Sequence, residues 1–214
     1  MIKYTGFILC ILFCRVFTSL KAQYIDNFCI ASMSQNSLYI ICRGTGHKFG
    51  EIADKFNIKD RNITHAGIGI IQNNELKIYN VNNDDQNGKT ALLIESTTKF
   101  LSYADIKYFG IWEFKSNALE INKLSNLLKK IYSKKIIFDM EFNDKNDDKL
   151  YCSEFCVKIL RKLNPSAFNY KQCKKELTGF YKMALDRDVL YYYPVDFFQK
   201  KNNFSLIFQK FYNP

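Results

Sequence analysis

The stretch HAGIGIIQNNELKIYNV, residues 65–81, contains two apolar segments separated by a pair of asparagines. Apolar residues recur at every second position in both segments, which is typical of half-buried strands. An Asn-Asn pair between two such segments indicates a tight hairpin, because asparagine tolerates the backbone conformation that the turn requires. The stretch therefore predicts an antiparallel pair that opens on His65 and carries the polar Asn80 near the end of its second strand.

Further strands are expected on both sides of this hairpin. Short segments rich in β-branched and aromatic residues predict them over residues 37–42, 91–95 and 107–114. Glycines after the first of these strands indicate a turn at Gly44, Gly46 and Gly50. The sheet is therefore expected to be antiparallel.

Helices are expected in three places. A short one is predicted over residues 52–56, and apolar residues at helical spacing predict a longer one over 119–131. A third helical pattern covers 150–160 and ends at Asn164, which precedes a proline. The order of these elements predicts an α+β fold, with an antiparallel sheet packed against helices.

The N-terminal segment has the features of an export signal. Lys3 supplies a positive start, an apolar run covers residues 7–14, and the small residue Ala22 suits cleavage. We expect residues 1–22 to be removed and the protein to be periplasmic or extracellular. The apolar run is shorter than the roughly 20 residues of a membrane span, so no span is expected. Residues 23–214 lack a Pro-rich or Ser/Gly-rich linker and are expected to form one domain.

The chain is basic, with a formal net charge of +10. This charge suits an anionic polymer or lipid surface as a partner, but a solvated lysine-rich surface is the favoured explanation. The lysines are scattered, and no basic array interleaved with aromatic residues marks a nucleic-acid module. Nucleic acid is therefore not an expected partner, and the oligomeric state stays open.

Of the seven cysteines, Cys10 and Cys14 lie in the expected export signal. An odd number remains, so at least one thiol is unpaired in an oxidising compartment unless two chains are joined. The pairing of the cysteines other than Cys152 stays open; these are Cys29, Cys42, Cys156 and Cys173. Zinc is not expected, because the chain has only two histidines and the spacing from Cys152 to the next cysteine is helical.

Cys152 lies where a polar loop gives way to a helix. There its thiol would face the positive end of the helix dipole and free backbone N–H groups, both of which lower a thiol pKa. A buried cysteine that only fills the core explains the same position, and Cys156 fits that reading better. Ser153 and Glu154 are expected to cap the helix.

A thiol nucleophile needs an imidazole to take and return its proton, and only His47 and His65 are available. His47 lies in a glycine-rich turn, whereas His65 opens a strand with small neighbours that permit close approach. A third polar residue should orient the imidazole. Asn80 occupies the neighbouring strand and would lie level with His65, and Glu95 is the alternative.

The strand opened by His65 and the later Tyr-Cys-Ser-Glu of residues 151–154 resemble the circularly permuted papain-like amidases of the YaeF/YiiX type, relatives of the NlpC-type cell-wall peptidases. In that family the histidine strand precedes the cysteine helix, as it does here. The resemblance spans about Leu38 to Phe198 and includes a late loop at residues 193–197. It implies a circularly permuted papain-like (NlpC-like) fold.

The resemblance also implies site residues. Cys152 corresponds to the nucleophile, His65 to the base and Asn80 to the polar third member, although relatives carry glutamate at that third place. The residues expected near the substrate are Tyr151, Tyr193 and Asp196.

The activity that follows is cleavage of an amide in a cell-wall peptide, a lipid-linked amide or a small amide, without a metal or an organic cofactor. A non-catalytic papain-like module that binds cell-wall peptide or lipid is the first alternative. The second is a structural protein in which Cys152 pairs with Cys156 or Cys173.

Overall fold

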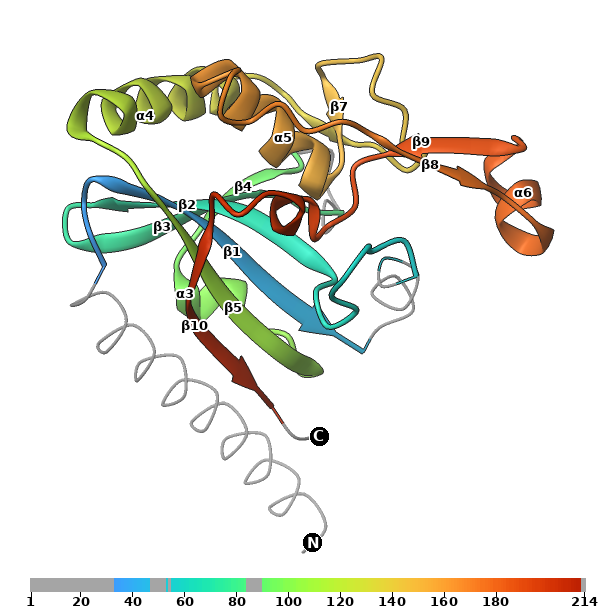
Figure 1. The fold of residues 1–214 in the computed structure, drawn as a ribbon, viewed down its shortest axis with the longest axis horizontal. Coiled ribbons are helices and arrows are strands. Elements are labelled where there is room, and N and C mark those ends of the chain that lie inside the picture. Colours follow the sequence, from blue (N-terminus) through green and yellow to red (C-terminus); the bar gives the residue numbers. More distant parts are fainter. Residues whose placement is uncertain (1–32, 47–52, 54, 84–89, 213–214) are drawn as a thin grey trace, which may run out of the picture.

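The computed structural model describes residues 33–46, 53, 55–83 and 90–212. Its centre is a six-stranded sheet with the strand order β10-β5-β1-β2-β3-β4, in which neighbouring strands are antiparallel (Figure 1). The strands of this sheet are β1 (Ser37–Thr45), β2 (His65–Gln72), β3 (Glu75–Val81), β4 (Leu92–Glu95), β5 (Ile106–Lys115) and β10 (Ser205–Phe211). The prediction of an α+β fold with a large antiparallel sheet is confirmed.

The hairpin of β2 and β3 forms as the sequence predicts. Asn73 and Asn74 both adopt positive φ angles, 53° and 61°, which is the backbone of a type I′ turn. The ladder runs from Gln72 opposite Glu75 to Ile68 opposite Tyr79. This register brings Asn80 to the neighbourhood of the first residues of β2.

The turn expected at Gly44 is wrong, because β1 continues through this residue to Thr45. A Cβ atom at Gly44 would lie 1.9 Å from the backbone oxygen of Asn62, so the glycine is required by a close approach of two segments and not by a turn. Gly46 follows the strand. Gly50 lies outside the described residues, as do residues 52 and 54 of the helix expected over 52–56. Of the other residues of that segment, Ala53 is helical and residues 55–56 form a turn.

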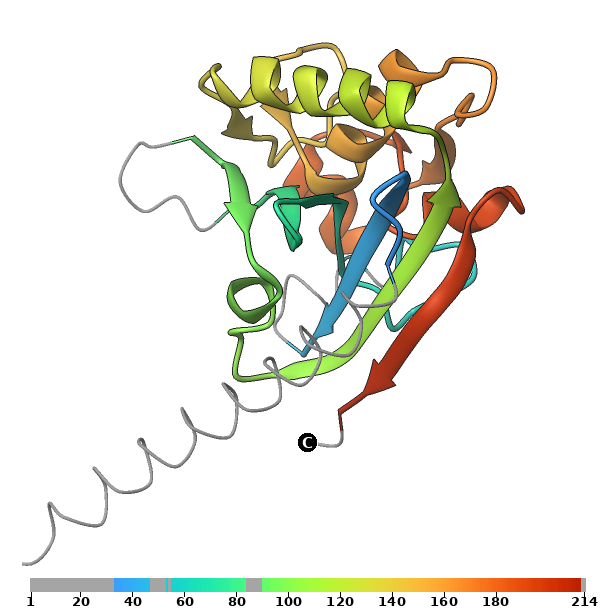
Figure 2. The same ribbon diagram turned by 90° about the vertical axis from the view of Figure 1, so that its left-hand side faces the viewer.

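Two helices cover one face of the sheet. These are α4 (Ala118–Tyr132) and α5 (Cys152–Leu163), which lie side by side above the strands (Figure 2). The C-cap of α5 is Asn164, as predicted. The helix begins two residues later than the sequence pattern, because Tyr151 has an extended backbone and is the N-cap.

Several short elements have no counterpart in the sequence analysis, because each is too brief for its periodicity to register. They are α3 (Thr97–Phe100), β6 (Ile137–Phe138), β7 (Lys149–Leu150), β8 (Cys173–Glu176), α6 (Gly179–Leu185), β9 (Val189–Tyr192) and the 3-10 helix η1 (Phe197–Lys200). The β8–β9 hairpin carries α6 and projects from the body of the protein (Figure 1). In the described part of the chain, no helix has the length and apolar character that crossing a membrane requires.

The two faces of the sheet serve different cores. On β2, Ala66 and Ile68 belong to the core under α4 and α5, together with Phe155 of the cysteine helix. On the opposite face, Ile41 of β1 packs in a second core with Phe100 of α3. Successive residues of one strand point to opposite faces of the sheet, so neighbouring residues of the candidate site can belong to different cores.

Candidate active site

Cys152 is the first residue of α5. Its thiol is almost completely buried, with 8% of the residue exposed. Backbone N–H groups lie close enough to the thiol to lower its pKa, including those of Ala66 in β2 and Ser153 in its own helix. The β2–β3 ladder begins only at Ile68, so the Ala66 amide lies beyond the paired part of these two strands. The thiol therefore lies close to Ala66, the residue that follows His65 in β2.

The pKa of Cys152 differs from the sequence-based expectation. Burial raises the pKa above its ordinary value, and this effect outweighs the backbone N–H groups and the Arg43 guanidinium, which lower it. The helix start does lower the pKa of the thiol, as the sequence predicts. The net shift of the pKa is nevertheless upward, so the expectation of a lowered pKa is wrong. The resting group is therefore a neutral thiol at neutral pH.

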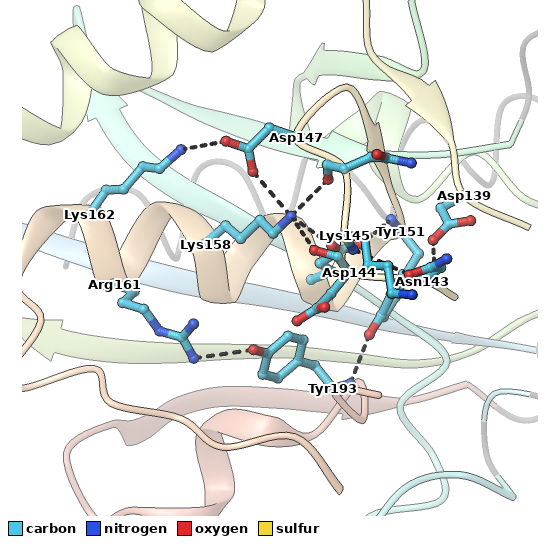
Figure 3. Close-up of polar contacts among 12 residues, drawn as sticks. Asp139, Asn143, Asp144, Lys145, Asp147, Tyr151, Lys158, Arg161, Lys162 and Tyr193 are labelled. Carbon is cyan, nitrogen blue, oxygen red and sulfur yellow. Dashed lines mark hydrogen bonds and ion pairs between the residues drawn. The ribbon is translucent and has the colours of Figure 1, made fainter. Parts of the chain in front are cut away.

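The helix start is held by charge as well as by packing. Glu154 lies in the first turn, and its Oε2 accepts a hydrogen bond from the Tyr151 N–H at 3.4 Å, which confirms its predicted capping role. Its other oxygen lies 3.0 Å from the Lys158 Nζ. Lys158 also pairs with Asp147 at 3.1 Å and donates to backbone oxygens of residues 144 and 146 (Figure 3). This ammonium ties the loop before Cys152 to the helix.

The Ser153 hydroxyl does not cap the helix. It donates to the backbone oxygen of Tyr193 at 2.7 Å, so the predicted cap is replaced by a tertiary contact. The Tyr193 N–H in turn donates to the Tyr151 hydroxyl at 2.8 Å (Figure 3). The segment that follows β9 is thereby pinned to both sides of Cys152.

Glu154 should make stability depend on pH. Burial raises the pKa of its carboxyl from 4.5 to about 7, although the Lys158 ammonium lowers it. Between these values the native state keeps a proton that the unfolded chain has released, so the free energy of unfolding should fall as pH rises through this range. We expect Glu154→Gln to flatten that fall, because an amide cannot ionise. Urea unfolding at stepped pH measures the slope.

The matched control for this experiment is Glu176→Gln, which removes one negative charge from an exposed position on β8. It should keep the wild-type slope between pH 4.5 and about 7. A slope in Glu154→Gln equal to that of the wild type would contradict the assignment.

His65, Asn80 and Glu95 form a buried chain of hydrogen bonds. The His65 Nε2 lies 2.9 Å from the Asn80 Oδ1. The Asn80 Nδ2 donates to the Glu95 Oε2, also at 2.9 Å. The three residues come from β2, β3 and the end of β4, which are neighbours in the sheet. The pairing of the hairpin thus brings His65 and Asn80 together, as the sequence predicts. The pairing of β4 with β3 adds Glu95, the alternative third residue, behind Asn80.

A permanent cation lies beside the imidazole. Arg43 of β1 is directly opposite His65 in the ladder, and its Nη1 donates to the Phe100 backbone oxygen at 2.9 Å. The guanidinium lies over the rings of Phe100 and Tyr103, at 4.4 and 4.1 Å. Burial, and then Arg43, hold the pKa of His65 well below its ordinary value, while the hydrogen bond to Asn80 raises it. The imidazole is therefore neutral at neutral pH.

Cys152 and His65 lie on opposite faces of the sheet, although the thiol lies close to the backbone of Ala66, the residue after His65. Cys152 packs in the core under α5, whereas the His65 ring contacts Phe100, at 5.8 Å between centroids, in the core of the other face. Among the described residues no hydrogen bond joins the Cys152 thiol to the His65 ring. His47, the other histidine, lies outside the described residues.

Gly67 permits the close approach that the sequence predicts for the small neighbours of His65. A Cβ atom at this position would lie 2.8 Å from the Tyr79 backbone oxygen and 2.9 Å from the Asn80 Cβ. β3 therefore fits against β2 at the level of Asn80 only because residue 67 has no side chain.

Replacing Gly67 with alanine should push β3 away from β2 and lower the free energy of unfolding by about 2 kcal/mol, the range of overpacked cores. Gly69→Ala is the control, because its nearest atoms are the movable side-chain ends of Ile41 and Leu76. Guanidinium unfolding compares the two. An equal loss of unfolding free energy in Gly67→Ala and Gly69→Ala would mean that the approach of β3 to Gly67 is no tighter than the side-chain contacts of Gly69.

The residues expected near the substrate make structural contacts. Tyr151 is buried, and its hydroxyl accepts from Tyr193. The Tyr193 hydroxyl accepts from Arg161 at 3.2 Å (Figure 3). Asp196 is fully buried, and its carboxylate accepts from the backbone N–H groups of residues 58–60 at 2.6 to 3.1 Å. These contacts position loops around Cys152; a role toward the substrate stays a prediction.

The thiols in the described part of the chain are free. Cys42, Cys152, Cys156 and Cys173 form no disulfide with one another, so the pairing of Cys152 required by the structural-protein alternative is not present. Cys29 lies outside the described residues. Within residues 33–46, 53, 55–83 and 90–212, no group of three His, Cys, Asp or Glu side chains could hold a metal ion.

Sequence reasoning missed two residues of the site. Arg43 directly follows the strand expected over residues 37–42, and no local pattern marks it as a site residue. Its position next to an apolar run is the one signal that it could be buried. Lys158 lies four residues after Glu154, and the i, i+4 acidic-to-basic spacing could have identified the pair.

Comparison with solved structures identifies a similar fold. The chain is similar to the metalloprotein YiiX of Escherichia coli O157:H7, described as DUF1105, with a TM-score of 0.58 and 11% sequence identity. The match covers 84% of this chain and 99% of that one. No protein-family model and no curated protein matches the sequence. The YiiX-like architecture is therefore shared, at a sequence identity that carries the fold alone.

Proposed function

We propose that the protein is an exported cysteine hydrolase of the circularly permuted papain-like type, which cleaves an amide bond through Cys152, His65 and Asn80. The observation that carries this proposal is the buried chain from His65 to Asn80 to Glu95, with the Cys152 thiol against the backbone of the next residue, Ala66. The YiiX-like fold supports it, and in this chain the strand that opens on His65 precedes the helix that begins at Cys152, which is the order that the resemblance to the permuted papain-like amidases implies.

The reaction begins from a neutral pair. The Asn80 oxygen faces the His65 Nε2, which leaves Nδ1 as the nitrogen that can accept a proton. As the Cys152 sulfur forms a bond to the amide carbonyl carbon, its proton passes to His65 Nδ1. His65 then gives this proton to the departing amine nitrogen as the C–N bond breaks.

Water completes the cycle. It loses a proton to His65 as it attacks the thioester, and the acid product leaves while the sulfur recovers a proton. In this proposal the backbone N–H of Cys152 donates to the developing oxyanion, because N–H groups at a helix start have no acceptor within the helix. The cycle requires the thiol and Nδ1 to come within hydrogen-bond reach when substrate binds, a contact that often tightens only in the complex.

Alkylation of Cys152 should follow a raised thiol pKa. We expect labelling by iodoacetamide to increase steadily through the alkaline range, with no plateau near neutral pH, because burial disfavours the thiolate. Peptide mass spectrometry separates this thiol from the more exposed Cys173, which serves as the internal reference. Rapid labelling of Cys152 at mildly acidic pH would instead indicate a preformed thiolate–imidazolium pair.

The proposed substrates are amides of the cell envelope: a cell-wall peptide, a lipid-linked amide or a small amide. This proposal joins the expected export signal over residues 1–22 to the basic charge of the chain, which attracts anionic polymers.

The test is to trap the acyl intermediate. Protein is incubated with purified cell-wall stem peptides, an N-acyl phospholipid or amino-acid anilides, and is then quenched with acid. A mass increase equal to the acyl group, confined to the Cys152 peptide and absent from Cys152→Ala, supports the proposal. No adduct and no released amine with any of the three substrate classes would remove the hydrolase assignment.

One observation favours a second candidate, a papain-like binding module. The thiol is buried and protonated, and it has no hydrogen bond to the His65 ring in the described structure. A binding module would retain stem peptide or lipid without turnover. Isothermal titration with the same three probes distinguishes the two, because heat of binding without amine release identifies the module.

A further inference from the structure

We infer that Glu95 is a positioning residue that holds the Asn80 amide in one orientation and thereby determines which nitrogen of His65 carries the proton. The inference deepens the proposed function, on which its catalytic consequence rests. It starts from two hydrogen bonds, each 2.9 Å long, that join His65 to Asn80 and Asn80 to Glu95.

An asparagine side chain has an acceptor end and a donor end, and its hydrogen-bond partners decide which way it faces. Toward an isolated histidine either end would serve, since a neutral imidazole has one donor and one acceptor nitrogen. Asn80 is fully buried, and Glu95 is nearly so. Water is therefore a poor substitute partner, and the amide depends on the protein for its orientation.

Glu95 removes the ambiguity. A carboxylate only accepts hydrogen bonds, so the Asn80 amino group must face Glu95 and its oxygen must face His65. An oxygen in that place requires a hydrogen on the His65 Nε2. Because burial and Arg43 hold the pKa of His65 low, the ring has one hydrogen only, and Nδ1 keeps its lone pair.

The reversed amide would disable the base. It would present its amino group to His65, and Nε2 would then have to accept. The hydrogen would move to Nδ1, the nitrogen that the proposed reaction needs for the Cys152 proton. The carboxylate thus acts on the reaction through Asn80 without touching the substrate.

The pairing of β3 and β4 places Glu95 within reach of the Asn80 amide. β3 and β4 pair with Asn80 opposite Leu93 and Ile78 opposite Glu95. Glu95 is therefore diagonal to Asn80 across the ladder, within reach of a long side chain. It is the last residue of β4, and the strand ends where its carboxylate is needed.

Nitrogen-15 NMR of the imidazole rings in the full chain reads the tautomer directly. The chain has only two histidines, so His47→Gln assigns the signals. At mildly alkaline pH we expect His65 to show a protonated Nε2 and an unprotonated Nδ1. In Glu95→Gln the new amide can accept or donate, so both orientations of Asn80 become available, and a substantial share of the other tautomer should appear.

A charge-preserving swap provides the rescue. In the double variant Asn80→Asp, Glu95→Gln, position 80 has an obligate acceptor toward His65, and the new amide at position 95 can donate to it. The Nε2–H tautomer should return. Cleavage, which should fall about tenfold or more in Glu95→Gln because the wrong tautomer cannot act as base, should recover with it.

The outcomes separate this inference from the proposed function. An unchanged tautomer in a folded Glu95→Gln protein overturns the inference, whether or not the wild type cleaves amides. A redistributed tautomer, restored by the swap, supports it even where no amide is cleaved, in which case only the proposed function fails. Loss of cleavage in Glu95→Gln without a tautomer change would mean that Glu95 acts through stability or charge.

Discussion

Replacing Cys152 with alanine is expected to lower the rate of amide cleavage by at least on the order of 10⁴-fold, because the variant has no group that can form the acyl intermediate. The free energy of unfolding should change by only about 1 kcal/mol, since one small buried group is removed. Amine release from the substrate found by acyl trapping measures the rate. Urea unfolding measures the stability of the same preparation.

Cys156→Ala is the matched control for this variant. Cys156 lies one turn later in α5 and is fully buried in the same core. Its loss should cost stability of similar size and leave cleavage within about threefold of the wild type, because its thiol fills the core. Equal activity in the wild type and Cys152→Ala would end the assignment of the nucleophile.

Replacing Asp196 with alanine is expected to lower the free energy of unfolding by about 3 kcal/mol, since hydrogen bonds to a charged group are each worth about 1.5–3 kcal/mol and do not add fully. The buried carboxylate accepts from the backbone N–H groups of Ile58, Lys59 and Asp60. It thereby joins the start of η1 to the loop before β2. Without it, these amides lose their acceptor.

Hydrogen exchange tests whether the loss of stability in Asp196→Ala is concentrated in the loop that the carboxylate binds. Protection of the amides of residues 58–60 should fall in Asp196→Ala more than protection in α4. Asp196→Asn keeps one acceptor oxygen and should be intermediate, which preserves the test should the alanine variant fail to fold. The control is Asp60→Ala: its carboxylate accepts from Asn62 at the surface, so the cost should be about 1 kcal/mol or less. Equal costs at the two positions would mean that Asp196 is not the anchor of the loop.

The local sequence was sufficient for the elements that carry the site. The alternation of residues 65–81 and their Asn-Asn turn predict the hairpin, and its register alone brings Asn80 to His65. The position of Cys152 at a helix start also follows from local pattern. These features depend on periodicity and turn chemistry within a few residues of each other.

Features that depend on distant segments were not available from the sequence. The thiol pKa is an example: the helix start that lowers it is local, while the burial that raises it comes from the packing of α5 on β2. The same holds for Gly44, whose role comes from Asn62 in another segment. Asp196 likewise finds its partners 136 to 138 positions earlier in the chain.

The sequence by itself determined the α+β class, the hairpin and the choice of Cys152, His65 and Asn80, because each depends on residue type and short-range order. Only the tertiary structure decided that Glu95 is hydrogen-bonded to Asn80 behind His65, that Arg43 lies beside His65, and that the thiol is neutral. The physical reason is that hydrogen-bond direction, burial and the field of a buried charge arise between strands and helices that fold together, and none of them is a property of one segment.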